Sequence, residues 1–252
     1  MFLAAAGVPE SPNFLTYLSR YFDNPFFNFL SDWDSVFFSF LVAVLLSLVF
    51  IIGTRKKEMI PTGLQNILET IVESFRNFIV GILGKDGEKY VPFLGTLFLY
   101  ILCMNLIGLV PLMKSPSSSL NVTIALAICV FVLVQYLNIK NMGIRGFLYH
   151  LAGSPKDFVG WLIAPLMFPI EILTQVSRPI TLALRLFGNI LGEKILLAFF
   201  TLVGVTLLVF FPVQLPFVFL GVLTGLMQAL VFTLLSTIYI LLSVPHSEEN
   251  NH

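Results

Sequence analysis

Arg185 is a charged residue in a part of the sequence that is otherwise almost free of charge. No Asp, Glu, Lys or Arg occurs between residues 195 and 243, and residues 158–175 contain only Glu171. An arginine at the centre of a bilayer costs at least ~3 kcal/mol on insertion scales, so such a residue usually has a function. The cation could line a pore, take part in a relay or receive a carboxylate of a partner. The alternative is a structural ion pair with Glu193 or Glu171.

Polar side chains recur around Arg185 at helical spacing. At about 100° per residue, a spacing of seven returns to nearly the same face, which aligns Arg178 with Arg185. Lipid does not accept such a polar stripe, so it must face water, a polar partner or another protein. The polar residues on or near the stripe are Glu171, Thr174, Arg178, Thr181, Arg185 and Asn189, with Glu193 about 80° away.

The composition is that of an all-α integral membrane protein with a single domain, residues 1–252. Of the 252 residues, 57% are hydrophobic and 11% are charged, and the mean hydropathy is +0.93. Soluble domains contain about 25% charged residues. The formal net charge is zero, which offers nothing for nucleic acid to bind. The spacing of the two Cys and three His residues matches no disulfide framework or metal site, so no cofactor is expected.

Uncharged stretches predict five transmembrane helices, because about 20 apolar residues cross the hydrocarbon layer. Residues 62–84 instead alternate apolar and charged side chains at spacings of three and four, which predicts an amphipathic helix at the cytoplasmic interface. Residues 1–34 are expected outside and residues 244–252 in the cytoplasm. Nine Lys and Arg residues then lie inside and two outside, in agreement with the positive-inside rule. The expected spans are 35–54, 90–113, 120–139, 158–210 and 215–243.

The fourth span is too long to stand upright in a membrane. A helix from Pro169 to Val209 would measure ~60 Å at 1.5 Å per residue, against a hydrocarbon layer of ~30 Å. It must therefore tilt steeply or bend, and Pro179 is one place for a bend. The fifth span returns beside it and carries Gln228, whose amide needs polar partners when buried.

The sequence LALRLFGN at residues 182–189 resembles the signature of subunit a of F-type ATP synthases, the static proton-channel subunit beside the rotating c-ring. Residues 98–111, 121–123 and 226–230 resemble other typical segments of this family in the same order. The resemblance covers nearly the whole chain. It implies that the last two helices form a long, steeply tilted hairpin beside the c-ring.

The resemblance also implies roles for individual residues. Arg185 matches the essential arginine that faces the ionised carboxylate of each passing c-subunit. A fixed cation favours the charged form of a carboxylate. Each carboxylate would therefore release its proton before passing, and direct leakage between two half-channels would be blocked. Asn189, Glu193 and Gln228 would line the outer half-channel and Glu171 the inner one, with further channel-lining positions at Ser119, Thr174, Arg178 and Thr181.

Three positions depart from the family pattern. Ser119 stands where many members have Asp, and Gly221 stands where many have His or Glu. Glu193 lies eight residues after Arg185, where a spacing of nine is commoner. We therefore expect the outer half-channel to depend on Glu193 and ordered water. The alternative is that Glu193 is an interfacial residue paired with the adjacent turn.

Other functional classes fit the sequence less well. A secondary ion-coupled transporter is the main alternative, but such proteins usually contain internal repeats, and none is visible. An intramembrane enzyme would need a nucleophile with a base, and no His or Cys lies near Arg185. The resemblance implies a non-catalytic subunit whose partners are the c-ring, the peripheral-stalk subunit b, other synthase subunits and the lipid bilayer. The expected location is a bacterial inner membrane, with an organelle energy-transducing membrane as the alternative.

Overall fold

All regular structure in the described part of the chain is helical. The computed structural model describes residue 21 and residues 33–55, 63–110, 113–151, 158–206 and 214–243. These ranges contain no strand, as expected for an all-α protein. The elements are α4 (Asp34–Gly53), α5 (Leu64–Leu83), η1 (Lys85–Tyr90), α6 (Val91–Ile107), η2 (Pro116–Ser118), α7 (Leu120–Leu151), α8 (Phe158–Thr206) and α9 (Gln214–Ser243), where η marks a 3-10 helix.

Four segments of the described chain are long and apolar enough to cross a membrane. They are Asp34–Gly53, Gly87–Ile107, Leu120–Gly143 and Leu215–Ser243. The chain is therefore a multi-pass membrane protein built from helices. The fourth expected span, residues 158–210, stays a prediction.

Two of the helices differ in length from the uncharged stretches that predicted them. α6 ends at Ile107, although the uncharged stretch continues to residue 113. Gly108 is a poor helix former, and the proline at 111 disfavours helical geometry in the residue before it. α7 continues beyond residue 139 and changes direction at Gly143, where φ is 70° and ψ is 166°. Glycine adopts this left-handed conformation without a steric penalty.

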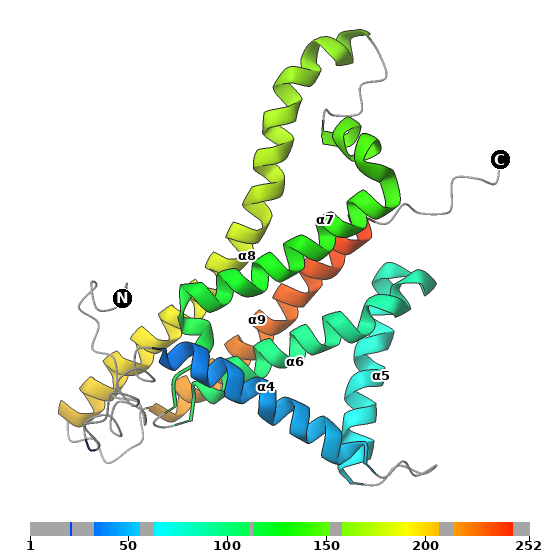
Figure 1. The fold of residues 1–252 in the computed structure, drawn as a ribbon. Helices are drawn as coiled ribbons and strands as arrows, with labels where there is room; N and C mark the ends of the chain where they lie inside the picture. Colours follow the sequence, from blue (N-terminus) through cyan, green and yellow to red (C-terminus); the bar gives the residue numbers. More distant parts are fainter. Residues whose placement is uncertain are drawn as a thin grey trace.

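The apolar helices pack side by side around one core. In Figure 1, α6, α7 and α9 run in similar directions, and α4 crosses them. α7 packs on α8, α6 packs on α9, and α8 packs on α9. The largest fully buried apolar side chains of the described residues are Ile79, Leu94, Ile101, Met104, Val130, Leu186, Phe232 and Ile240.

The amphipathic helix α5 closes a triangle with α4 and α6 (Figure 1). Its Ile79 side chain is fully buried, and the Phe75 ring stacks on Phe98 of α6 with 4.9 Å between centroids. On its exposed side Arg76 forms a salt bridge with Glu88 of η1. One face of α5 thus contacts the apolar bundle while another carries charge, the pattern typical of an interfacial helix.

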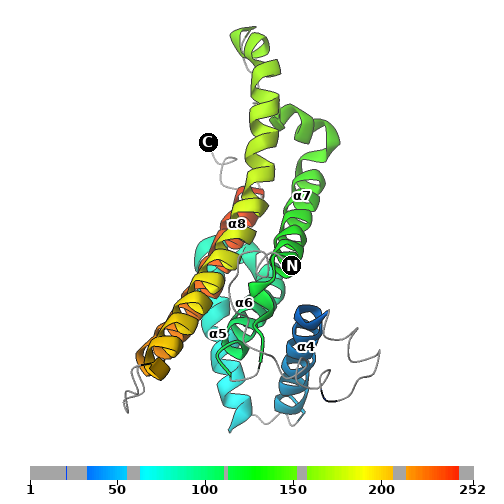
Figure 2. The same cartoon turned by 90° about the vertical axis from the view of Figure 1, so that its left-hand side faces the viewer.

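α8 is the longest helix of the described chain. Its 49 residues correspond to about 74 Å at 1.5 Å per residue. The helix is bent near its middle, and its first part extends beyond α9 (Figures 1 and 2). Prolines at 165, 169 and 179 lie inside it. Since proline removes a helical hydrogen bond and crowds the preceding turn, Pro179 accounts for a bend in this region.

Candidate functional site

Side-chain contacts define how α8 and α9 face each other. Asn189 Nδ2 of α8 donates a hydrogen bond of 2.5 Å to Gln228 Oε1 of α9. The rings of Phe200 and Phe217 stack with their centroids 3.7 Å apart. Residue numbers rise along α8 as they fall along α9, so the two helices are antiparallel. The middle of α8, with Arg185, therefore lies against the middle of α9.

Arg185 is exposed, while the opposite side of the same turn is buried. Within the described chain, no carboxylate forms a salt bridge with its guanidinium, so a structural ion pair with Glu193 or Glu171 is absent from these residues. α8 directs this cation away from the protein core. The buried residues around it on α8 are Leu182, Ala183, Leu186 and Ile190.

The surface around this cation is largely apolar, apart from the exposed Thr181 and Asn189 four residues before and after it. Leu184, next to Arg185 in the sequence, is 52% exposed. A charged side chain on a large exposed apolar surface indicates contact with lipid or with another protein, because water alone does not favour such a surface. The other exposed apolar side chains near the middle of the two helices are Val176, Ile180, Leu223, Leu226, Met227 and Leu230.

Gln228 is buried between the helices and is only partly satisfied. Its side chain is 3% exposed, and its Oε1 accepts the hydrogen bond from Asn189. Its Nε2 has no hydrogen-bond partner among the described residues. Buried amides normally use both groups, so the remaining donor is available to a water molecule or a proton-carrying group. Gln228 therefore lies opposite Asn189 on the contact line between α8 and α9.

Glu193 lies further along α8, half-buried against Gly221 of α9. No described side chain forms a hydrogen bond or a salt bridge with its carboxylate. The next residue, Lys194, donates a hydrogen bond of 2.7 Å to Ser118 Oγ of η2. A pairing of Glu193 with the adjacent turn is therefore absent from the described residues. It is the neighbouring cation that makes the contact with the turn.

Ser118 contacts α8 through Lys194, while the channel-lining role of the next residue, Ser119, stays a prediction. Ser118 is 2% exposed, and its hydroxyl donates to the carbonyl of Ser115 at 2.7 Å. The backbone N–H of Ser119 donates to the carbonyl of Pro116 at 3.0 Å, which ends η2 before α7 begins.

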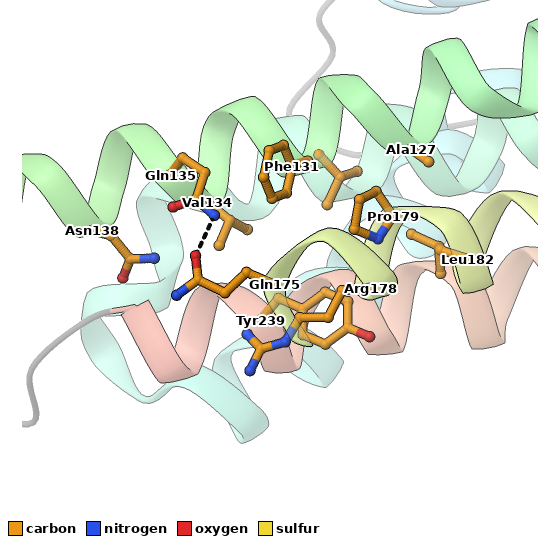
Figure 3. A pocket seen from close by; sticks show the side chains of 11 residues that line it. Ala127, Phe131, Val134, Gln135, Asn138, Gln175, Arg178, Pro179, Leu182 and Tyr239 are labelled. Atoms are coloured by element: carbon orange, nitrogen blue, oxygen red, sulfur yellow. Dashed lines mark hydrogen bonds between the residues drawn. The ribbon is translucent and has the colours of Figure 1, made fainter. Parts of the chain in front are cut away.

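Glu171 lies at the other end of the site in a chain of amide side chains. Gln175 Nε2 donates to Glu171 Oε1 at 3.3 Å. Gln135 Nε2 of α7 donates to Gln175 Oε1 at 2.8 Å, as Figure 3 shows. Gln135 and Gln175 were not predicted, because a single helical periodicity does not reveal a contact between helices 40 residues apart in sequence.

Arg178 turns toward α9 instead of following Arg185 to the exposed surface. Its guanidinium carbon lies 5.2 Å from the centroid of the Tyr239 ring, a cation–π contact. Together with Gln135, Asn138 and Gln175 it lines a small open cleft between α7, α8 and α9 (Figure 3). The prediction of one continuous polar stripe is therefore wrong at Arg178, because the aromatic ring and the cleft draw this side chain inward.

The two threonines of the predicted stripe bond to their own helix. Thr174 Oγ1 donates to the carbonyl of Ile170 at 2.9 Å, and Thr181 Oγ1 donates to that of Ser177 at the same distance. Both side chains are exposed. Their hydroxyl protons are committed to the backbone, so only their oxygen lone pairs remain for water or a passing group.

Comparisons with known proteins extend over most of the chain. The family described as "ATP synthase A chain" matches residues 36–241. The chain is 59% identical to the ATP synthase subunit a of Protochlamydia amoebophila over 251 residues, 97% of this chain and 93% of the relative. It is 40% identical to that of Geobacter sulfurreducens over 208 residues, 82% of this chain and 86% of the relative. The bundle of apolar helices, the exposed cation of α8 and these matches agree, and the chain belongs to the ATP synthase A chain family.

Proposed function

We propose that this protein is the stator subunit a of an F-type ATP synthase. It forms two proton half-channels against a rotating c-ring and couples proton flow across the membrane to rotation and ATP synthesis. The observation that carries this function is the exposed guanidinium of Arg185, set in the apolar surface of α8 without a carboxylate partner among the described residues. The subunit itself is non-catalytic.

Arg185 acts as an electrostatic gate. A carboxylate of the ring that reaches this cation is stabilised in its ionised form, so it arrives at Arg185 without a proton. A proton therefore cannot cross directly from one half-channel to the other. It must travel on the ring, and the ring must turn for the proton to reach its exit. The gate needs an unpaired cation, and the exposure of Arg185 supports this role.

Glu193 and the Asn189–Gln228 pair line the outer half-channel. The carboxylate of Glu193 exchanges protons with ordered water, and the amides extend the polar path along the α8–α9 seam toward Arg185. Lys194 anchors this part of α8 to η2 through Ser118, beside the position of Ser119.

The inner half-channel begins at the cleft between α7, α8 and α9. Glu171 receives or releases protons beside the cleft, where the amide of Gln175 holds its carboxylate and is itself held by Gln135. Arg178 adds positive charge to the cleft wall. The hydroxyl oxygens of Thr174 and Thr181 extend the polar surface along α8.

α8 and α9 form a tilted hairpin that faces the c-ring, and α8 is the fourth of five transmembrane helices. The antiparallel contacts between the two helices support the hairpin, and the length of α8 supports the tilt. The N-terminus lies outside and the C-terminus in the cytoplasm of a bacterial inner membrane, supported by the distribution of basic residues and by the bacterial relatives. The helix α5 lies at the cytoplasmic interface, and subunit b of the peripheral stalk is a further partner.

Purification of the chain from its native membrane in a mild detergent tests this function. We expect an affinity-tagged chain to carry with it a c-ring, a peripheral stalk and a catalytic head that hydrolyses ATP. A chain that purifies alone and drives ion-coupled solute uptake in liposomes would instead be a secondary transporter.

Replacement of Gln228 by Leu is expected to slow ATP-driven acidification of inverted membrane vesicles without loss of assembly. Asn189 loses its acceptor, and one hydrogen bond of about 1 kcal/mol corresponds to roughly a fivefold change. The unpartnered Nε2 disappears as well, so the helix pair is not destabilised. Thr233→Val is the control, because this buried hydroxyl bonds only to the Ala229 carbonyl of its own helix. Equal rates in the two variants would contradict the role of Gln228.

A further inference from the structure

We propose that Gly221 is a positioning residue for Glu193. Because Gly221 has no side chain, the Glu193 carboxylate packs directly against its α-carbon, and we call this contact the seat. This role rests on the proposed function, in which Glu193 exchanges protons in the outer half-channel. It assigns a task to a position where the family pattern leads one to expect a titratable side chain.

The space above Gly221 is already filled by the carboxylate. A Cβ atom on Gly221 would lie 2.5 Å from Glu193 Oε1 and 3.0 Å from Glu193 Cδ, whereas ordinary van der Waals contacts begin near 3.4 Å. Gly221 is buried, so the carboxylate cannot simply turn into open space on that side. Glu193 can keep its place only because residue 221 has no side chain.

Other glycines of α8 do not have this constraint. At Gly188 and at Gly192, which directly precedes Glu193, an added Cβ would meet nothing within 4 Å. Glycine inside a helix is unfavourable compared with alanine, since it loses more conformational freedom on folding. At Gly221, glycine is nevertheless required, because the carboxylate of Glu193 on the neighbouring helix occupies the space that a side chain would need.

The seat aligns Glu193 with the Asn189–Gln228 amide pair. Gly221 and Gln228 are seven residues apart on α9, and Glu193 and Asn189 are four apart on α8, so each pair of positions shares a helix face. The carboxylate and the Asn189–Gln228 hydrogen bond therefore lie along the same seam between the helices. A carboxylate held at a fixed point of this seam meets the same water and the same amides in each transfer cycle.

Gly221→Ala is expected to slow ATP-driven acidification at least about tenfold in assembled complexes. The Cβ would push the carboxylate by about 1 Å, and misplacement on this scale can cost up to 10²-fold in a geometry-dependent step. Gly81→Ala is the control, because it is the same substitution inside helix α5, where an added Cβ would meet nothing within 4 Å. We expect it to pump protons at the wild-type rate.

Two double variants separate the seat from ordinary helix packing, because the same Cβ would also lie 2.9 Å from Leu109 Cδ2. In Gly221→Ala/Glu193→Asp the carboxylate is withdrawn by one methylene, which makes room for the new Cβ. In Gly221→Ala/Leu109→Ala only the packing contact is relieved. Recovery of proton flux with Glu193→Asp supports the seat. Recovery with Leu109→Ala alone, or with neither, overturns it.

The same pair of variants decides the matter if Gly221→Ala lowers the amount of assembled complex. Restored assembly with Glu193→Asp supports the seat, and restoration with Leu109→Ala alone, or with neither, overturns it. Glu193→Gln, measured in parallel, isolates the underlying function. If Glu193→Gln stops pumping while Gly221→Ala pumps normally, the seat is wrong and the proposed function stands. If Glu193→Gln pumps normally, the outer half-channel itself is wrongly assigned, and the positioning role of Gly221 is overturned as well.

Discussion

Arg185→Ala is expected to abolish ATP-driven acidification of inverted membrane vesicles while the complex stays assembled. Without the cation, a ring carboxylate that faces α8 has no group that favours its ionised form, so it can pass the stator with its proton still bound. Proton movement and rotation then become uncoupled. Because Arg185 is exposed and pairs with no described carboxylate, its removal is expected to change stability by no more than about 0.5 kcal/mol.

The measurement is the quenching of a pH-sensitive dye after addition of ATP, with subunit content checked in the same vesicles. Arg76→Ala is the matched control, because Arg76 forms an exposed salt bridge on α5, and such pairs contribute about 0–1 kcal/mol. It should pump like the wild type. Retained pumping in Arg185→Ala would make this residue a structural cation and would remove the main support for the proposed function.

Glu193→Gln is expected to reduce proton flux to a small fraction of the wild-type rate. The amide has nearly the same shape as the carboxylate, so the contact with Gly221 and the helix packing remain. It cannot bind and release a proton at physiological pH, however, so only water and neutral amides would remain in the outer half-channel. Since the described site offers no second carboxylate near Glu193 on the α8–α9 seam, no other group replaces it.

Vesicle acidification and ATP synthesis driven by an imposed proton gradient both report this loss. Glu69→Gln serves as the control, because Glu69 is an exposed carboxylate on α5 that accepts a hydrogen bond of 2.8 Å from Gln65. Near-normal pumping by Glu193→Gln would show that Glu193 is an interfacial residue. In that case Lys194 and its contact with Ser118 would be the important feature of this turn.

The helices themselves are largely predictable from the distribution of charge. α4 and α9 begin and end within one residue of the uncharged stretches at 35–54 and 215–243. The departures occur where backbone geometry decides the outcome, at the early end of α6 and at Gly143 of α7. Hydrophobicity defines what can be buried in a membrane, but turn-forming residues decide where a helix stops.

Only the features of the site that lie on a single helix can be predicted from the sequence. The spacing of Arg185, Asn189 and Glu193 follows from a single helical period, and these positions were found in this way. The hydrogen bond from Gln135 to Gln175 and that from Lys194 to Ser118 join different helices and were missed. Helical periodicity gives the angle of a side chain around the helix axis, but it does not identify the residue of another helix that this side chain contacts.

The length of α8 has a consequence for how voltage drives the protein. Although α8 bends near its middle, its contour of about 74 Å fits into a layer of ~30 Å at an average lean of about 66° from the membrane normal. The stretch from Glu171 to Glu193 then covers about 30 Å in the membrane plane but only about 13 Å of depth. The membrane potential does about 2.3 kcal/mol of work per charge per 100 mV, and only for movement along the normal. In the proposed function, about four-tenths of the potential would therefore fall between the depths of Glu171 and Glu193, and the rest across the paths that lead from them to the two membrane surfaces.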